Sequence, residues 1–496
     1  MGDFGHDFVA LSYVWGSNTK PVLTQSTKDK YLEIGSLSRV NVPPTIWDIM
    51  DLVSDLGEQY LWVDSVCIVQ DELSDKRKYL PIMGEIYDNA KLVVVAAVKD
   101  AHSGIPGRGD NQRRWTRNTE RIQGIDFTNG GPMLCHRLET TTWNTRGWTY
   151  QEAQLARRAL IITDSQVYWN CREETWREER FAEFQNLRFV PASQDSLFTG
   201  TAPEALGRGY ALTTVPCSLG TYCDKVYEFS MRLFTDSRDA LWACVGILKS
   251  LLPEFPQGYI WGIPKVNLDA ALLWEAYGPW KYREPLKIPI PIANGGWQEL
   301  MIPSWSWISE ASTVRYSVCR VRVKPMVEWH DPVPFEKLGL LSETREREQE
   351  GMESPQSTIF LDQLSSERSI FDFALLHFTA QSTILKIRRP LSLKPVTGCI
   401  HYIVRAKIGL LSGRNIGSIR IPLGTFSGHN EIQGEFLLLS RSGTDQYGHE
   451  LEEQKYNIML IRWSDDNKLA YRVTWTEVRK SDWEECETQR KTIILG

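Results

Sequence analysis

The sequence predicts an open α/β sheet in the first part of the chain, then a helical middle region and a β-rich C-terminal region. Strand-like and helix-like patterns alternate over residues 8–170, which is typical of such a sheet. Within residues 91–97, Lys91 is followed by an unbroken, Val-rich apolar run, which favours a parallel sheet covered on both faces. After residue 380, short β-branched stretches divided by turn signals predict mostly antiparallel strands. The expected domains are residues 1–185, 186–310 and 311–496.

The elements of the first region follow from apolar spacing and turn residues. Gly16 and the polar residues after it end the first apolar run, which is therefore expected to be a short buried strand. Pro43 and Pro44 precede apolar residues at helical spacing, and Gly57 stands where a helix C-terminal glycine belongs. The expected elements are a strand at 8–15, a helix at 46–56, a strand at 60–64, a helix near 82–87, a strand at 91–97, an insertion at 104–131, a helix from 143 and a strand at 159–163.

The rest of the chain is expected to be helical first and β-rich later. Candidate helices lie at residues 224–234, 237–247 and 268–277. In residues 303–308 tryptophan alternates with serine, which predicts a strand with both indoles on one side. Residues 343–357 are charged and lack an apolar period, so a disordered loop is expected there. The expected C-terminal strands are at residues 383–387, 400–408, 416–421, 435–439, 456–463 and 470–475.

The composition is that of an ordinary globular protein and argues against several functional classes. Of the 496 residues 42% are hydrophobic and 24% charged, and the formal net charge of −6 gives no reason to expect nucleic-acid binding. No apolar stretch is long enough to span a membrane, and the N-terminus lacks the order of a signal peptide, so a cytoplasmic location is expected. The nine cysteines include no Cys-x-x-Cys pair and the histidines show no metal-ligand spacing, so neither a disulfide framework nor a metal site is expected.

Residues 143–158 contain the arrangement most typical of a functional site. An Arg-Gly-Trp bend opens a helix here, and Glu152 follows Trp148 by one turn, so an aromatic ring and a carboxylate occupy neighbouring helical positions. If residues 159–163 are a buried strand, the first turn of this helix faces the rim where α/β folds bind ligands. Glu152 is therefore the first candidate for a functional carboxylate.

Three blocks of the sequence resemble the fungal heterokaryon-incompatibility (HET) domain and occur in its order. They are Ala10-Leu-Ser-Tyr-Val-Trp-Gly16, residues 61–70 together with 83–90, and Thr145-Arg-Gly-Trp-Thr-Tyr-Gln-Glu152. Residues 238–241, 303–307 and 491–496 look like the downstream region of long HET-domain proteins. The resemblance implies a role in nonself recognition, in which contact between incompatible fungal cells triggers regulated cell death. Only nine residues precede the first block, so an upstream sensor is expected to be absent or supplied by another chain, with a truncated start as the alternative.

The HET domain is in turn similar to Toll/interleukin-receptor (TIR) domains, some of which cleave NAD with a helix carrying Trp-Cys-x-x-Glu. In this chain Trp148-Thr-Tyr-Gln-Glu152 keeps the spacing from Trp to Glu, whereas Thr149 replaces the cysteine. The resemblance implies a TIR-like, flavodoxin-like fold for residues 1–185 and self-association through the HET domain. It also implies NAD as the substrate of a candidate NAD glycohydrolase, with no cofactor required.

The same resemblance implies roles for residues in the blocks. Cleavage of the bond between nicotinamide and ribose passes through an oxocarbenium-like state, which a carboxylate such as Glu152 stabilises from near the ribose. The candidate NAD-binding residues are Tyr13, Trp15 and Trp148 for stacking on a ring, Arg146 for a phosphate, Ser12 or Ser65 for water or ribose, and Asp64 at its strand end.

Each candidate also has a structural alternative. Glu152 would instead pair with Arg157 or cap a neighbouring loop, and the two tryptophans would fill core volume. Asp64 would cap a helix, and Arg146 would form a salt bridge with the C-terminal domain. For the whole protein, the alternative to an NAD-cleaving effector is a non-enzymatic docking module that signals to other death machinery. A HET-domain protein without any role in cell death is a third alternative.

Overall fold

The computed structural model describes a large part of the chain, in two compact units. The described residues are 5–16, 22–109, 111–113, 118–129, 131, 133–171, 175–179, 218–277, 281, 283, 286–289, 297–300, 302–316, 322–334, 371–372, 374–390, 403–444 and 454–496. The first unit comprises Met1–Thr213, Arg232–Thr235 and Trp242–Ser250, and the second comprises Thr214–Met231, Asp236–Leu241 and Leu251–Gly496. The boundary expected near residue 185 and the loop expected at 343–357 lie outside the described residues, and the boundary near 310 stays a prediction.

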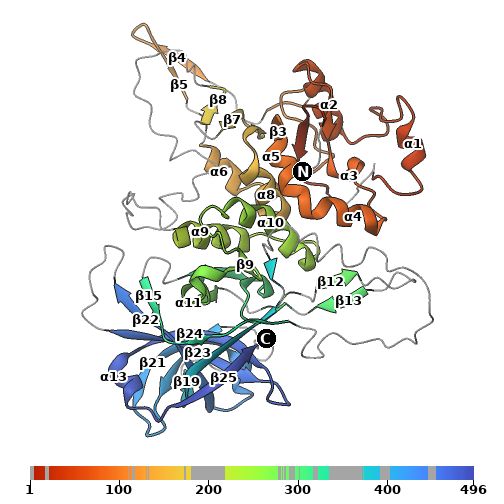
Figure 1. Cartoon of the computed structure of the whole chain (residues 1–496). Helices are drawn as coiled ribbons and strands as arrows, with labels where there is room; N and C mark the ends of the chain where they lie inside the picture. The colour runs from red at the N-terminus through yellow and green to blue at the C-terminus, as the bar shows by residue number, and fades with distance from the viewer. Residues whose placement is uncertain are drawn as a thin grey trace, which may run out of the picture. The chain divides into compact units, whose positions relative to one another are not determined.

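The first unit is built around a six-stranded sheet with the strand order β2-β1-β3-β6-β7-β8. Figure 1 labels three of these strands, β3, β7 and β8. Four strands are parallel: β1 (Val9–Ser12), β2 (Leu61–Trp62), β3 (Leu92–Ala96) and β6 (Arg158–Ile162). Their order is that of flavodoxin-like folds, so the predicted open parallel sheet is found for these four strands. The prediction of a parallel sheet is wrong at one edge. There β7 (Val167–Cys171) pairs antiparallel with β6 and β8 (Thr175–Arg177) pairs antiparallel with β7, so the whole sheet is mixed.

Helices cover both faces of this sheet. Because successive strand residues point to opposite sides, Val9 and Leu11 of β1 contact one face's helix, whereas Ala10 contacts the helices of the other face. The helix on the face of Val9 and Leu11 is α2 (Pro44–Asp55). The helices on the face of Ala10 are α5 (Met83–Asn89), α6 (Leu134–Glu139) and α8 (Gly147–Leu155). Ser12 follows Ala10 by two residues in the strand, so its side chain points to the same face of the sheet, toward α8.

Short elements connect these layers. The helices are α1 (Lys28–Leu32), α3 (Asp64–Cys67), α4 (Leu73–Tyr79) and α7 (Thr142–Thr145). The insertion predicted at residues 104–131 contains a hairpin of β4 (Thr119–Ile122) and β5 (Ile125–Thr128). No helix among the described residues is long and apolar enough to cross a membrane.

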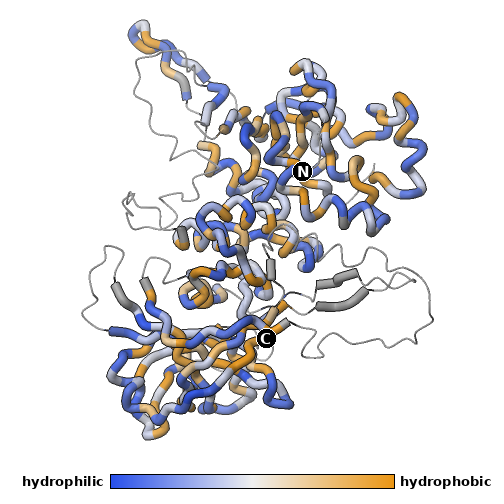
Figure 2. Tube along the Cα trace, viewed as in Figure 1, coloured by the Kyte–Doolittle hydropathy of each residue, from blue (hydrophilic) through white to orange (hydrophobic). Residues whose placement is uncertain are grey.

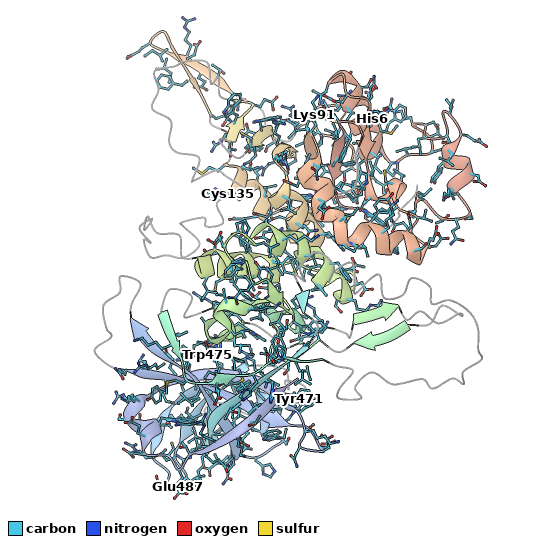
Figure 3. All side chains as sticks on the ribbon, in the orientation of Figure 1. His6, Lys91, Cys135, Tyr471, Trp475 and Glu487 are labelled. Atoms are coloured by element: carbon cyan, nitrogen blue, oxygen red, sulfur yellow. The ribbon has the colours of Figure 1, made fainter. Side chains whose placement is uncertain are left out.

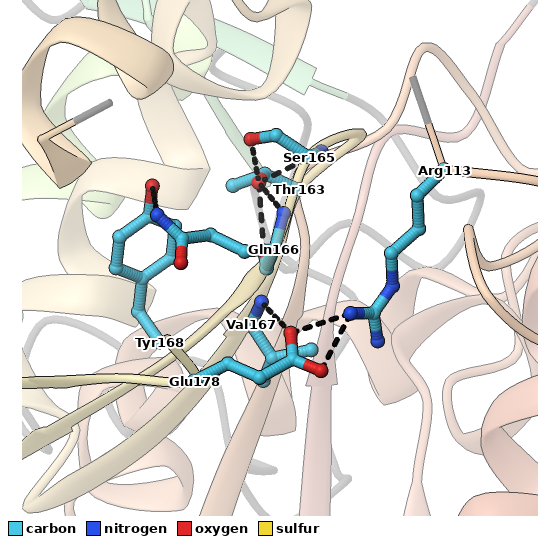
Figure 4. A network of polar contacts seen from close by, with 7 residues as sticks. All are labelled: Arg113, Thr163, Ser165, Gln166, Val167, Tyr168 and Glu178. Carbon is cyan, nitrogen blue, oxygen red and sulfur yellow. Dashed lines mark hydrogen bonds and ion pairs between the residues drawn. The ribbon is translucent and has the colours of Figure 1, made fainter. Parts of the chain in front are cut away.

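A polar network explains why the chain turns back after β6 (Figure 4). The Thr163 hydroxyl donates to the carbonyl of Gln166 at 2.8 Å and accepts from its N–H at 3.2 Å, which closes a tight turn. Glu178 then accepts the N–H of Val167 at 3.0 Å and both its oxygens pair with Arg113 at 2.5 Å. These contacts fix an antiparallel hairpin where a further parallel strand would need a crossover.

The second unit is dominated by a ten-stranded sheet, and the prediction of mostly antiparallel strands is confirmed. Its longest strand, β19 (Ala374–Arg388), pairs with β25 (Gln489–Leu495) and with β22 (Glu431–Thr444). Since β22, β23, β24 and β25 also pair in this order, the five strands form a ring. Buried and more exposed residues alternate along much of β19, and hydrophobic and hydrophilic residues are interspersed through this sheet (Figure 2). The other strands are β15 (Arg322–Pro325), β16 (Glu328–Trp329), β17 (Val333–Pro334), β20 (Ile403–Gly409), β21 (Asn415–Pro422), β23 (Lys455–Trp463) and β24 (Ala470–Arg479).

Two of the three helices predicted for the middle region are present. They are α9 (Ser218–Ser230) and α10 (Ala240–Ser250). The third prediction is right only for the short helix α11 (Leu268–Ala271) and wrong after it, because Trp274–Tyr277 is the strand β11, paired with β14 (Thr313–Tyr316). A short apolar run fits both periods, and here burial of every second residue shows the strand period.

The strand predicted at residues 303–308 is also wrong. The segment is a turn followed by the 3-10 helix η5 (Trp307–Ser309). Both indoles are nevertheless buried, and each donates to a different partner. The Trp305 Nε1 atom donates to the carbonyl of Leu495 at 2.9 Å, and the Trp307 Nε1 atom donates to the Tyr222 hydroxyl at 2.8 Å. The alternation of Trp and Ser thus reflects two tertiary hydrogen bonds and not a pleated surface.

Replacing Trp307 by alanine is expected to destabilise the second unit strongly. Its side chain is 1% exposed, and its removal leaves a cavity and takes away the indole hydrogen bond to the Tyr222 hydroxyl, so the free energy of unfolding should fall by about 3–5 kcal/mol. Denaturant unfolding measures this change. The control is Trp176→Ala at a 49% exposed position, expected to change stability by less than about 1 kcal/mol. Equal losses in the two variants would contradict this assignment of Trp307 to the core.

Candidate functional site

The carboxyl ends of two parallel strands bring candidate residues to one edge of the first unit's sheet. Ser12 is the last residue of β1, and Asp64 follows β2 and begins α3. The chain near His6 and Lys91 marks the opposite, amino ends of β1 and β3 (Figure 3). Because ligands of open α/β sheets bind outside the carboxyl ends of the strands, this edge is the candidate site.

Glu152 of α8 is buried at this edge and held by a chain of hydrogen bonds. It is 5% exposed, and the Ser12 Oγ atom donates to its Oε2 atom at 2.5 Å. The Trp143 Nε1 atom donates to Ser12 Oγ at 2.8 Å, which leaves the serine hydroxyl hydrogen for the carboxyl group. The Tyr87 hydroxyl interacts with Glu152 as well, and donates to the carbonyl of Leu11 at 3.1 Å.

Asp64 forms a second polar group beside the first. Its Oδ2 atom accepts from the Trp15 Nε1 atom at 2.8 Å, and its Oδ1 atom accepts the N–H of Ser65 at 2.7 Å. The Tyr13 hydroxyl donates to the Ser65 hydroxyl at 2.9 Å. The hydrogen bond from the Trp15 indole to Asp64 joins the loop after β1 to the start of α3.

The two carboxyl groups have separated pKa values. Burial and, after it, the charge of Asp64 raise the pKa of Glu152 to about 8, against hydrogen bonds with Ser12 and Tyr87 and the charge of Arg146. Burial also raises the pKa of Asp64 to about 6, opposed by its hydrogen bonds from Trp15 and Ser65. Near pH 7 the pair therefore carries mainly one negative charge, on Asp64, while Glu152 is mostly protonated.

The structure brings together most of the residues predicted from the sequence. Ser12 and Glu152 are in contact, and Tyr13, Trp15 and Asp64 form the neighbouring group.

The structural alternatives can be compared with these contacts. Arg157 pairs with Asp88 at 2.9 Å and not with Glu152. Arg146 acts on both carboxyl groups through its charge and donates to the Thr235 hydroxyl at 3.1 Å. Trp148 is partly buried and packs on the core of the sheet face that α5 and α8 cover.

Sequence reasoning missed two residues of the site, Trp143 and Tyr87. Tyr87 lies in the helix predicted near residues 82–87, and its hydroxyl interacts with the carboxyl group of Glu152. A buried tyrosine needs a partner for its hydroxyl. Trp143 is 1% exposed, and its indole N–H gives no signal in the sequence.

A separate cavity of about 350 Å³ lies between α2 and β2. Its lining is mainly apolar and includes Ile46, Val53 and Val63, with Ser54 and Glu58 as polar members. None of its described lining residues belongs to the Ser12–Glu152 group. Among the described residues, no three His, Cys, Asp or Glu side chains are placed to hold a metal ion.

Comparison with protein families identifies the domain that contains this edge of the sheet. The family model described as "Heterokaryon incompatibility protein (HET)" matches residues 8–152. Residues 8–152 are a HET domain. The match contains all three blocks recognised in the sequence, and it runs from the residue before β1 to Glu152 itself, so the family assignment is confirmed. Searches of curated proteins and of solved structures give no match. The HET domain gives this protein a general role related to heterokaryon incompatibility.

Removal of the Asp64 charge is expected to lower the pKa of Glu152. Asp64→Asn keeps the shape of the side chain and removes the charge that raises this pKa. A carboxyl titration by NMR on protein with labelled glutamate measures the midpoint, expected below the value of about 8 in the native protein. The matched control is Asp88→Asn, whose partner is Arg157. An unchanged Glu152 midpoint in Asp64→Asn would show that the two carboxyl groups are not coupled.

Proposed function

We propose that this HET-domain protein is a nonself-recognition effector that triggers regulated cell death by cleaving NAD when its HET domains self-associate. The main support is the buried Glu152, bonded to Ser12 and beside Asp64 at the carboxyl edge of the parallel strands. Two carboxyl groups whose pKa values are pushed apart are typical of acid and base assignments in active sites. The Trp148-to-Glu152 spacing, shared with NAD-cleaving TIR domains, adds to this support.

In the proposed reaction, the bond between nicotinamide and ribose breaks and nicotinamide leaves as a neutral molecule with the bonding electrons. An ionised carboxylate then stabilises the positive charge on the ribose, and water adds to it and gives up a proton. Ser12, oriented by Trp143, is placed to bind a ribose hydroxyl or the water. Trp15 is half-buried and suited to stack on a ring, and the guanidinium of Arg146 is suited to a phosphate.

The proposal includes an opening step. Glu152 is 5% exposed and mostly protonated at neutral pH, so NAD reaches an ionised carboxylate only after α8 or its neighbours move. Self-association is the event to which we assign this movement, because a second HET domain supplies contacts that differ between the closed and open forms.

The proposal is tested by inducible expression in fungal cells, with cellular NAD and viability measured at the same time points. NAD is expected to fall before viability does, and nicotinamide to rise in step with it. Death with unchanged NAD would contradict the enzymatic part of the proposal.

The second candidate is a non-enzymatic docking module that signals to other death machinery. It is favoured by the enclosure of Glu152, since a carboxyl group that is buried, protonated and hydrogen-bonded is also what a purely structural role requires. This candidate is expected to cause death without loss of NAD.

A further inference from the structure

A four-residue segment far from the matched region completes the HET domain. Arg232–Thr235, which we name the strap, belongs to the first unit, whereas the chain on both sides of it belongs to the second unit. The same is true of Trp242–Ser250, most of α10. The first unit thus takes two short segments from chain that otherwise builds the second unit.

The strap holds the turn between α7 and α8 by backbone hydrogen bonds. The N–H of Leu233 donates to the carbonyl of Thr145 at 2.6 Å, and the carbonyl of Leu233 accepts the N–H of Gly147 at 3.0 Å. Arg146, between these two residues, forms an isolated parallel β-bridge with Leu233. The N–H of Gly147 is in the first turn of α8, where no intrahelical partner exists, so the strap satisfies a helix-terminal donor.

Side chains of the strap reinforce this attachment. The Arg232 guanidinium donates to the carbonyl of Asn144 and lies 4.8 Å above the ring of Tyr150. The Thr235 hydroxyl accepts from Arg146 at 3.1 Å. A Cβ atom on Gly147 would lie 2.0 Å from the Phe234 ring, so only glycine lets the strap come this close.

The attachment lies directly before the residues that close the site. The strap holds residues 144–147, and Trp143 donates to Ser12, which donates to Glu152. The second borrowed segment contacts the other end: the N–H of Gly246 donates to the Gln151 Oε1 atom at 2.7 Å, one residue before Glu152.

We propose that the strap is a regulatory link through which the second unit controls whether the Glu152 site is closed or open. A rearrangement of the second unit that shifts residues on both sides of the strap pulls it from residues 144–147. The hydrogen bonds from Trp143 through Ser12 to Glu152 then lose their support. The regulatory role rests on the proposed function of this site, whereas the mechanical coupling does not.

The coupling is tested by hydrogen exchange on the full chain. Arg232→Met with Thr235→Val removes the hydrogen bond from Arg232 to Asn144 and the one from Arg146 to Thr235, so amides of residues 144–152 should exchange roughly tenfold faster or more. Exchange in β3, at Val93–Val95, should not change. Arg157→Met, which removes a guanidinium just after α8, is the matched control and should leave residues 144–152 unchanged. Unchanged exchange in the double variant would overturn the proposal.

A substitution inside the second unit tests the direction of control. The Ser230 hydroxyl accepts the N–H of Val314 at 2.8 Å and anchors the end of α9, two residues before the strap. Ser230→Ala is expected to speed exchange of residues 144–147, whereas Ser481→Ala at an exposed position in α13 (Lys480–Glu484) is not. If only the strap variants act, the strap is a static part of the HET domain and the regulatory link is refuted. If the double variant also speeds exchange in β3, the single Thr235→Val decides by the same criteria.

NAD cleavage by the same variants separates this inference from the proposed function. Faster cleavage in Ser230→Ala and in the strap variants would support both. Faster exchange with no cleavage in any variant or in the native protein would retain the coupling and refute the NAD-cleaving function. Slower cleavage in the strap variants would overturn the closing role, because the strap would then support the active form.

Discussion

Glu152→Gln is expected to give a folded protein that no longer kills cells on overexpression. Glutamine has the shape of a protonated glutamic acid, which is the form that the raised pKa of about 8 favours in the native protein, so the hydrogen bond from Ser12 is kept. The substitution removes the carboxylate that the proposed reaction needs, so NAD cleavage should fall by roughly a hundred- to a thousandfold. Cell viability and cellular NAD after induction measure the effect.

The matched control is Glu139→Gln, at an exposed position at the end of α6. It should kill as the native protein does. If Glu152→Gln kills equally well while its thermal unfolding shows an intact fold, the enzymatic account loses its central residue. The docking module would then be the better description of this HET domain.

Raising the pH from about 5 to 9 is expected to destabilise the first unit. Between pH 4.5, the ordinary pKa of a glutamate, and about pH 8, the folded protein keeps the Glu152 proton that the unfolded chain loses. The unfolded state then binds fewer protons, so the free energy of unfolding decreases as pH rises, by up to about 1.4 kcal/mol per pH unit from this group. Because the pKa of Asp64 is also raised, to about 6, this group lowers the free energy of unfolding further at the acidic end of this pH range.

Denaturant unfolding at a series of pH values measures this loss, and Glu152→Gln provides the comparison. The variant cannot ionise at this position, so its curve should be flatter and it should be more stable than the native protein at pH 8. Parallel curves for the two proteins would mean that Glu152 is ionised in the folded state, in contradiction to its burial beside Asp64.

Several site residues could be placed from the sequence because strand geometry decides their position. A buried strand at residues 8–15 points Ser12 and Ala10 to the same face, and the carboxyl end of the next strand puts Asp64 at the same edge. The Trp148-to-Glu152 helix then lies over that face. These inferences need only periodicity and the order of strands.

Other features depend on contacts that no local pattern records. The hydrogen bond from Trp143 to Ser12 joins residues 131 positions apart. The alternation of Trp305 and Trp307 with serine predicts a strand. The structure instead has a turn and a 3-10 helix there, and each indole forms a tertiary hydrogen bond. The strap begins 80 residues beyond the end of the family match, where nothing in its sequence indicates which unit it joins.

Because the strap and Trp242–Ser250 belong to the first unit, they affect which protein should be used in experiments. A fragment of residues 1–185 would lack the strap and the Trp242–Ser250 segment that contacts Gln151. The full chain is therefore the appropriate sample.

The most direct test of the account is NAD cleavage by the purified full-length protein, with nicotinamide and ADP-ribose separated by chromatography. Samples span concentrations below and above those at which the protein self-associates, and Glu152→Gln is measured in parallel. The account expects both products to appear only in the associated native protein and to be absent with Glu152→Gln. Full activity in dilute monomer would refute the self-association step. No product from folded, associated native protein would contradict the NAD-cleaving function itself.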